Sequence, residues 1–346
     1  MDHATHTRSQ RRVVFRADGG ALIGMGHLVR CFALANILRP HFHLTFASMV
    51  GDPVVPHLIR PHVDEVITLP ICDGQDDAIQ TFLGYLRPDD IVVIDDYDYD
   101  EAFHRAIIAA PDRRLVYIDD LQAMHMHAHA VINHNGGIQA SDYRHDPHTQ
   151  LYLGPDYALL RPPFLKVDPA SRAKAPRDHW FVCMGGSDPF NLTEKVVHAL
   201  LQLPEMRRCE VVIGPTNDSR EFLYNLVASE PERFALHVGL NAEEMCKVMQ
   251  SAWNAVCTSS GIAMEVCSVG MRMFTGHCVD NQLKLDAFFH ERGLGLSMGD
   301  LKALTTDQLV ETIRSTPVEH PMVEVQQSIF GGRQKAQLYS IFEPWK

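Results

Sequence analysis

The feature that most constrains the fold of this chain is an alternation of short β-branched runs with amphipathic helical patterns, found in both halves of the sequence. In the first half, strand-like runs begin with "RRVVF" and continue at 43–48, 64–70, 90–96, 113–120 and 129–135. In the second half they begin with "WFVCMGG" and continue at 209–214, 234–240, 254–260 and 271–277. Strands that alternate with helices predict parallel βαβ units, in which the loops after the strands build the ligand site. We therefore predict an α/β fold of two facing Rossmann-like domains with parallel sheets and an interdomain cleft that binds the ligand.

The length and one polar stretch predict the domain boundaries. A chain of 346 residues is longer than a single hydrophobic core usually organises. The stretch "KVDPASRAKAPRDH" is polar and contains two prolines, as linkers commonly do. We expect a disordered tail at 1–12, a first domain at 13–165, a linker at 166–178 and a second domain at 179–346. The last helical pattern, before Pro344, is expected to cross back to the first domain.

The composition argues against several classes of protein. A net charge of −12 argues against nucleic-acid binding, which needs a basic face. No apolar run approaches the roughly 18 residues that a membrane-spanning helix needs. The eight cysteines form no CxxC pair, and most lie in apolar runs, as free thiols of a reducing compartment do. The polar start "MDHATHTRSQRR" lacks the apolar core of a secretory signal. We expect a cytoplasmic protein without membrane or nucleic-acid partners, and the oligomeric state stays open.

The loop after the first strand carries the first candidate site residues. Gly24 and Gly26 flank a methionine between a strand and a helix, where glycines let the backbone approach a ligand and expose helix N-terminal amides. The dinucleotide pattern GxGxxG is broken because Val29 stands at its third glycine position. His27 follows in the first helical turn, which favours the neutral ring that a general base requires. Packing or capping of the turn explains His27 equally well by spacing alone. Arg30, one turn further, is a candidate anion contact or the partner of a carboxylate.

A second glycine pair follows the first strand of the second half. Gly185, Gly186 and Ser187 lie between "WFVCM" and a helix that begins near Asn191. Exposed amides in such a loop, together with the helix N-terminus, can hold a phosphate group. Ser187 or Asn191 can also serve simply as the helix cap.

Two further loops of the second half offer polar groups at a helix start. Ser260 and Gly261 open one helix, and Glu265 lies one turn later, where its carboxylate suits the two hydroxyls of a ribose. A capping box with the nearby serines explains the same residues. Asn281 and Gln282 follow the next strand, and their amides suit a sugar hydroxyl or an acetamido group, although helix capping explains them equally well.

Two patterns resemble metal sites. The acidic run at 95–101 contains the DxD pattern of some glycosyltransferases, but it fits a solvated loop better, and within it Tyr97 is the candidate site residue. His125, His127 and His129 alternate and would share one face of a strand. The sequence shows no ligand that converges with them, so a histidine-rich surface edge is predicted. We predict neither a metal nor any other cofactor.

Taken together, these motifs resemble one known family. "FRADGGALIGMGHLVRCFALA", "VVIDDYDYD", "YIDDL", "LGPDYALLRPPF", "VCMGGSDPFNLT", "SSGIAMEVCSVG" and "DNQ" occur in the order found in the UDP-2,4-diacetamido-2,4,6-trideoxy-β-L-altropyranose hydrolase (PseG) family of pseudaminic acid biosynthesis. The resemblance runs from Phe15 to Gln282. That family is similar to the UDP-sugar glycosyltransferases of GT-B fold, and it implies the same fold here.

The resemblance also implies a reaction and roles for residues. Water would displace UDP from C1 of the sugar nucleotide with inversion, without a metal. The family's histidine, tyrosine and asparagine fall on His27, Tyr97 and Asn281, and its uridine side falls on the second domain. The chain departs from the family at Asp96, where many members have histidine, and we expect this carboxylate to face away from the substrate.

Three other functions compete with hydrolysis. A GT-B glycosyltransferase would use the same UDP-sugar site but would deliver the sugar to an acceptor other than water. An inactive sugar-nucleotide-binding protein would bind UDP and release none. A nicotinamide oxidoreductase is disfavoured by the broken glycine pattern at Val29.

Overall fold

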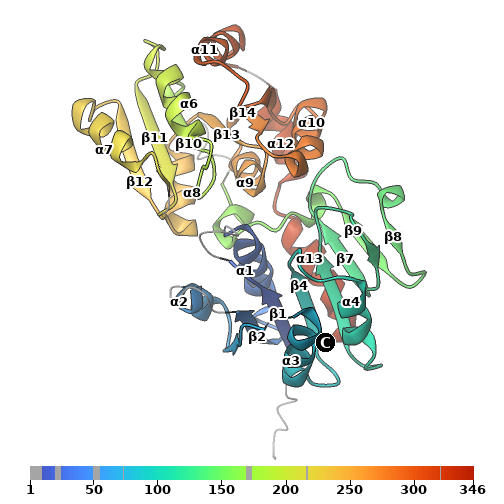
Figure 1. The fold of residues 1–346 in the computed structure, drawn as a ribbon. Coiled ribbons are helices and arrows are strands. Elements are labelled where there is room, and N and C mark those ends of the chain that lie inside the picture. The colour runs from blue at the N-terminus through green and yellow to red at the C-terminus, as the bar shows by residue number, and fades with distance from the viewer. Residues whose placement is uncertain are drawn as a thin grey trace, which may run out of the picture.

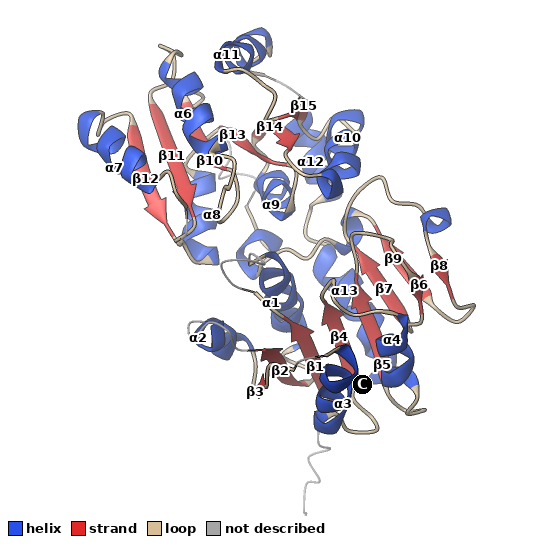
Figure 2. Ribbon diagram, viewed as in Figure 1, coloured by secondary structure: helices blue, strands red, loops and turns tan. Residues whose placement is uncertain are grey.

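The computed structural model describes residues 10–19, 25–49, 55–72, 74–168, 174–215, 217–319 and 321–346. Two parallel sheets, each covered by helices on both faces, form the two halves of the molecule (Figures 1 and 2). This confirms the predicted α/β class with two Rossmann-like sheets. The tail predicted at 1–12 stays a prediction, because residues 1–9 lie outside the described residues; the first strand begins at Arg12.

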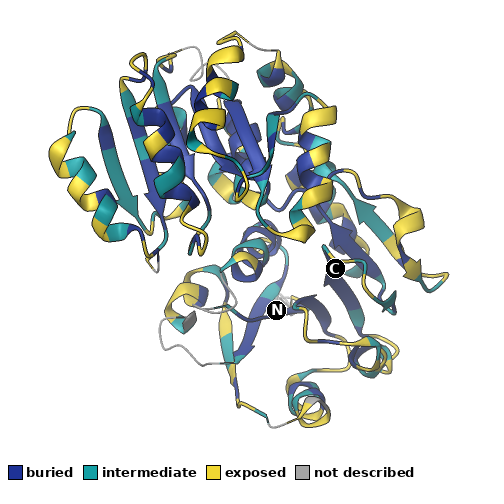
Figure 3. Cartoon of the chain, turned by 45° about the horizontal axis from the view of Figure 1, so that its top comes forward, coloured by how far each residue is buried: buried dark blue, intermediate teal, exposed yellow. Residues whose placement is uncertain are grey.

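The first sheet has seven parallel strands in the order β3-β2-β1-β4-β5-β7-β9. Its strands are β1 (Arg12–Ala17), β2 (His43–Met49), β3 (Glu65–Leu69), β4 (Ile91–Asp95), β5 (Arg114–Ile118), β7 (Ala130–Asn133) and β9 (Gln150–Leu153). The helices between them are α1 (Gly26–Leu38), α2 (Val55–Ile59), α3 (Gln75–Tyr85) and α4 (Glu101–Ile108). Val13 and Phe15 of β1 pack against α1, whereas Val14 packs on the opposite face with α3 and α4. Because helices cover both faces, the inner strands of this sheet, β1, β2, β4, β5 and β7, are buried along most of their length rather than at alternate residues (Figure 3).

The second sheet has six parallel strands in the order β12-β11-β10-β13-β14-β15. Its strands are β10 (His179–Cys183), β11 (Arg208–Ile213), β12 (Phe234–Val238), β13 (Asn254–Thr258), β14 (Arg272–His277) and β15 (Leu296–Asp300). The helices are α6 (Leu192–Leu201), α7 (Arg220–Ser229), α8 (Ala242–Gln250), α9 (Gly261–Val269), α10 (Leu283–Glu291), α11 (Thr306–Ser315) and α12 (Met322–Ile329). Alternate residues of β10 again serve two cores, with Phe181 on the side of α8 and α9 and Trp180 on the side of α6.

Both sheets therefore have the same switch point. The chain order reverses between β1 and β4 in the first sheet and between β10 and β13 in the second. In open parallel sheets, ligands bind outside the carboxyl ends of the strands at such a point. The edge strands β9 and β15 are not predicted by the sequence analysis, but neither adjoins a switch point.

Two segments join the halves. Residues 155–165 run between the sheets, with Leu159 in the core beside α1 and with Leu160 and Phe164 in the core beside α8 and α9. The last helix, α13 (Gln334–Phe342), returns from the second half and packs on α1 through Leu338 and Phe342 (Figure 1). These alternating contacts fix the orientation of one sheet relative to the other.

No helix within the described ranges is both long enough and apolar enough to cross a membrane.

Candidate active site

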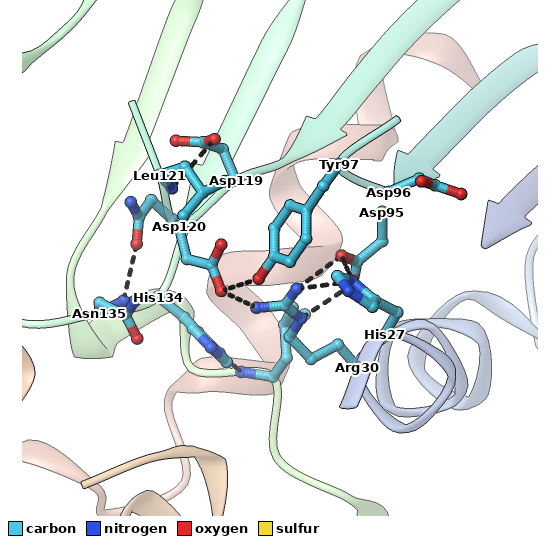
Figure 4. Close-up of polar contacts among 12 residues, drawn as sticks. His27, Arg30, Asp95, Asp96, Tyr97, Asp119, Asp120, Leu121, His134 and Asn135 are labelled. Carbon is cyan, nitrogen blue, oxygen red and sulfur yellow. Dashed lines mark hydrogen bonds and ion pairs between the residues drawn. The ribbon is translucent and has the colours of Figure 1, made fainter. Parts of the chain in front are cut away.

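A histidine and an aspartate meet at the switch point of the first sheet. His27 is the second residue of α1, and Asp95 is the last residue of β4. The Nδ1 atom of His27 lies 2.6 Å from Oδ1 of Asp95 (Figure 4). Asp95 is completely buried, and His27 is 7% exposed. An ionised carboxylate only accepts hydrogen bonds, so this 2.6 Å contact, which is shorter than the 3.0 Å approach of Arg30 Nη2 to the same nitrogen, favours the proton on Nδ1. In a neutral ring, Nε2 then carries the lone pair.

Arg30 holds this carboxylate from a second direction. Its Nε donates to Oδ2 of Asp95 at 2.9 Å, and Nη2 donates to Oδ1 at 2.6 Å, which makes a bidentate pair. Its Nη1 donates to Oδ2 of Asp120, which follows β5, at 2.8 Å. The same Asp120 oxygen accepts the hydroxyl of Tyr97 at 2.9 Å. We call the set His27, Arg30, Asp95, Tyr97 and Asp120 the polar cluster.

Charge balance keeps Asp95 ionised in the polar cluster. Burial alone would raise the pKa of Asp95, but the charge of Arg30 and the hydrogen bond from His27 outweigh it, so this pKa lies below its usual range. Burial and the neighbouring Asp120 raise the pKa of the Tyr97 phenol, which therefore stays protonated and can donate. Of the two rings in the cluster, Tyr97 is 48% exposed, whereas His27 is buried beneath it. The two rings meet edge to face with centroids 4.6 Å apart.

Asp96 faces away from the polar cluster, as expected. Its side chain points to the other side of the strand end in Figure 4, where Oδ2 lies 3.8 Å from Nη1 of Arg16. Arg16 is fully buried and also pairs with Asp18 at 2.6 Å. The extra carboxylate is thus neutralised within the first half and does not face His27.

Glycine geometry shapes the switch point of the second sheet. Gly185 has φ +101°, a conformation that side chains rarely adopt, and Gly186 is exposed. A Cβ on Gly214 would collide with the backbone of Gly186, so the loops after β10 and β11 touch through bare backbone. Ser187 is half-buried beside them. Asn191 occupies the N-cap position of α6, as one of the two alternatives proposed, but its side chain makes no capping bond. The capping oxygens come instead from Asp188, which accepts from the amides of residues 192 and 193.

The neighbouring loop brings Glu265 against Arg161. Both Glu265 oxygens accept from the Arg161 guanidinium at 2.6 Å, and Glu265 is 5% exposed. Ser260 is half-buried at the N-cap of α9 without a side-chain capping bond, and Gly261 is exposed. Glu265 thus forms an ion pair with the segment that joins the two sheets, a partner that the sequence analysis does not foresee.

Asn281 and Gln282 lie in the short helix η5 (Asp280–Gln282) before α10. Oε1 of Gln282 accepts from the amide of Cys278, so it closes this turn, whereas Asn281 is exposed. The following α10 contacts the first half, because Phe288 fills the space where a Cβ of Gly136 would lie. The loop that carries Asn281 is therefore anchored beside the first sheet.

The structure thus brings His27, Arg30 and Tyr97 together. It places the loops of Gly185 and Ser260 at the matching switch point and Asn281 and Gln282 after the next strand, β14. Gly26 begins α1 one residue before His27, and Gly24 lies outside the described residues. The sequence analysis missed Asp95 and Asp120 as members of the cluster. Their signal was present, because both "VVIDD" and "VYIDD" end a buried strand in aspartates.

The chain has relatives among curated proteins, although no protein-family model matches it. It is 24% identical to the UDP-2,4-diacetamido-2,4,6-trideoxy-β-L-altropyranose hydrolase of Campylobacter jejuni, over 73% of this chain and 87% of that protein. It is 24% identical to the spore coat polysaccharide biosynthesis protein SpsG of Bacillus subtilis, over 88% of this chain and 89% of that protein. An uncharacterised protein of Methanocaldococcus jannaschii, MJ1062, is 27% identical over 73% of this chain, which spans about half (52%) of that relative.

Solved structures share the fold at low identity. MurG of Acinetobacter baumannii superposes with a TM-score of 0.61 at 15% identity, covering 94% of both chains. UGT71G1 of Medicago truncatula, solved in complex with UDP-glucose, superposes with a TM-score of 0.62 at 12% identity, covering 97% of this chain and 98% of that one. These matches confirm the GT-B fold and, with the curated hydrolase, the resemblance that the motifs indicated.

Proposed function

We propose that this chain hydrolyses UDP-linked 2,4-diacetamido-2,4,6-trideoxy-L-altrose to the free sugar and UDP, as a step of pseudaminic acid biosynthesis. Relatives named for a UDP-sugar hydrolase and for polysaccharide biosynthesis support a UDP-sugar substrate. The observation that carries the proposal is the buried 2.6 Å contact between His27 and Asp95, which orients a ring at the ligand-binding edge of the first sheet.

In the proposed reaction, His27 is the general base. Asp95 fixes the proton on Nδ1, so Nε2 can accept a proton from water as the water oxygen attacks C1 of the sugar. The new C1–O bond forms on the face opposite the leaving group, the bond from C1 to the diphosphate oxygen breaks, and the electron pair leaves with UDP. Inversion at C1 follows. A positioned base of this kind typically accelerates a reaction about 10²–10⁴-fold.

The remaining candidates divide between the two halves of the substrate. We assign the sugar to the first half and to the loop of Asn281. Tyr97 would accept a hydrogen bond from a sugar hydroxyl, because its one O–H already donates to Asp120. Arg30 would position Asp95 rather than contact substrate, because its guanidinium is already engaged by two carboxylates. The residues that we assign to the substrate beside these are Gly24, Gly26, Gly185, Gly186, Ser187, Ser260, Gly261, Glu265 and Gln282.

We assign the diphosphate to the second half. Amides of the loop at Gly185 and Gly186 would stabilise the charge that develops on UDP, as backbone donors do in oxyanion sites. UDP is a good leaving group, so the proposal needs neither a protein acid nor a metal at this site.

The direct test supplies the purified chain with the UDP-linked sugar in ¹⁸O-labelled water and no added metal. We expect UDP release, ¹⁸O in the sugar and not in UDP, and an inverted anomer as the first product by NMR. Label in the β-phosphate of UDP would show P–O cleavage and contradict the mechanism, and retention of configuration would do so as well.

The second candidate is a GT-B glycosyltransferase that uses the same kind of donor. Its support is the fold, which matches glycosyltransferases over nearly the whole chain. The two candidates differ in what accepts the sugar. Release of UDP that requires an added sugar or lipid acceptor would favour the transferase, whereas full turnover with water alone favours the hydrolase.

A further inference from the structure

A second group of polar side chains lies at the outer edge of the first half, away from the polar cluster. The short strands β6 (His125–Met126) and β8 (Arg144–His145) pair in parallel, with His125 opposite Arg144. Figure 2 shows this pair beyond the last strands of the first sheet. Because the register is parallel, the residues that follow the two strands, His127 and Asp146, also lie side by side.

Three ligand atoms converge there. Nε2 of His125 lies 2.9 Å from Oδ1 of Asp146, and Nδ1 of His127 lies 2.9 Å from Oδ2. The two imidazole rings stack with centroids 4.5 Å apart. Among the described residues, this is the group of histidine, cysteine and acidic side chains whose ligand atoms all fall within 4.8 Å of one another. The sequence analysis predicts a plain surface edge because it has no means of finding Asp146.

A fourth residue makes the arrangement more specific. Oε2 of Glu101, the first residue of α4, lies 3.4 Å from Nε2 of His127, and Oε1 accepts from the backbone amide of His125. His127 therefore has a carboxylate at each ring nitrogen. In a neutral ring that donates from Nδ1 to Asp146, the Nε2 lone pair would face Glu101, which is unfavourable. If a metal takes Nδ1, the proton moves to Nε2 and points at Glu101, the usual outer partner of a ligating histidine.

We propose that His125 Nε2, His127 Nδ1 and Asp146 bind a divalent transition-metal ion, best matched by Zn²⁺. Two imidazoles and one carboxylate are ligands that Zn²⁺ accepts, and water would take the fourth position, because His125 and Asp146 are 33% and 24% exposed. Glu101 orients His127 from outside the ligand set. The site would tie β6, the turn after β8 and the start of α4 together, and it is independent of the proposed hydrolysis.

The test measures Zn²⁺ affinity in the full chain, purified without a histidine tag and stripped with a chelator, by competition against a chromophoric chelator. We expect one tight equivalent per chain. His127→Gln and Asp146→Asn should abolish it, and Glu101→Gln should weaken it about 10–100-fold. His148→Gln is the matched control, because this exposed histidine lies two residues beyond Asp146 and outside the cluster.

Two outcomes would overturn the proposal. One is wild-type protein without a tight Zn²⁺ equivalent, and the other is unchanged affinity in folded His127→Gln. If these variants fail to fold, Co²⁺ spectra of the unmodified protein decide instead, because the proposed ligands give d–d bands without a thiolate charge-transfer band. The competing arrangement is an imidazolium at His127 that bridges the two carboxylates. In that case Zn²⁺ would leave the NMR signals of His125 and His127 unmoved, and the proposal would fail.

Discussion

The two sheets repeat one topology but present opposite chemistry at their switch points. The first places a histidine, an arginine and two aspartates at its strand ends, joined by side-chain hydrogen bonds of 2.6–2.9 Å. The second presents glycine backbone, with Gly185 in a left-handed conformation and Gly186 exposed. The buried carboxylates Glu265 and Asp188 at this edge are engaged within the protein, Glu265 by Arg161 and Asp188 by the first amides of α6. The same scaffold thus supports side-chain chemistry in one half and backbone amides in the other.

This difference suggests a division of labour. A proton acceptor needs a defined tautomer, and a network of buried charges can hold one. A diphosphate is large, strongly charged and best met by several amides, which only a loop without side chains can bring close. Side-chain substitutions should therefore act mainly on kcat in the first half, and backbone changes should act mainly on KM in the second.

Among these substitutions, His27→Ala is expected to have the largest effect on turnover. Loss of the proposed base should lower kcat about 10²–10⁴-fold with little change in KM, measured as UDP release. His43→Ala is a matched control, because this half-buried histidine begins β2 at the opposite end of the strands. Unchanged turnover in a folded His27→Ala protein would remove His27 from the mechanism and with it the contrast between the two switch points.

The second-largest effect is expected for Asp95→Asn, which should lower kcat on the order of 10²-fold or more. An amide can turn its NH₂ toward His27 and favour the tautomer in which Nε2 carries the proton. The substitution also leaves the Arg30 charge with one partner fewer, and breaking a buried pair typically costs about 3–5 kcal/mol of the free energy of unfolding. Urea unfolding measures that loss separately from kcat. A variant with wild-type kcat and reduced stability would make Asp95 a structural residue only.

A comparison of KM between Gly185→Ala and Ser187→Ala tests whether backbone amides bind the diphosphate at the second switch point. A Cβ at φ +101° strains the loop by about 1–3 kcal/mol, and relief of that strain should move the amides and raise KM roughly tenfold. Ser187→Ala removes one proposed substrate contact but keeps the backbone, so KM should rise less than in Gly185→Ala. If Ser187→Ala is the more damaging variant, side-chain chemistry governs the second half as well.

Lowering the pH should destabilise the first half of the molecule before the second. Burial lowers the pKa of His104, His129 and His134 to about 4, and all three belong to the first half. Unfolded histidine titrates near 6.5, so between about pH 6.5 and 4 the unfolded state binds more protons, and the free energy of unfolding falls as the pH falls. Each histidine contributes up to about 1.4 kcal/mol per pH unit in that window.

Hydrogen exchange at pH 5 and pH 7 measures this difference sheet by sheet. We expect protection to fall mainly in strands β1–β9. His104→Phe should reduce the loss of protection at pH 5. Among the described residues neither nitrogen of this buried ring has a hydrogen-bond partner, so a phenyl ring can replace its packing against Tyr117 without losing a hydrogen bond. Equal loss of protection in both sheets would contradict the assignment of the acid sensitivity to the buried histidines of the first half.

Much of the fold and part of the candidate site follow from local patterns. Strand runs such as "IVVI" before Asp95 are apolar without alternation because they are buried on both faces, and this pattern predicts parallel sheets. The glycine loops and His27 stand directly after strands, where a ligand edge is expected. The segment "LGPDYALLRPPF", by contrast, has no obvious role in the sequence. Its role becomes visible only when Leu159 and Leu160 are seen to enter different cores.

The sequence by itself determined the two α/β halves with parallel sheets and the loops that follow their strands, because hydrophobic periodicity and glycine positions act over a few residues. Only the tertiary structure decided which groups meet there. Asp95 lies 68 residues from His27, and Glu265 lies 104 residues from Arg161. Such pairs are selected by the strand order and register that bring distant strand ends together, and neither composition nor spacing along the chain carries that information.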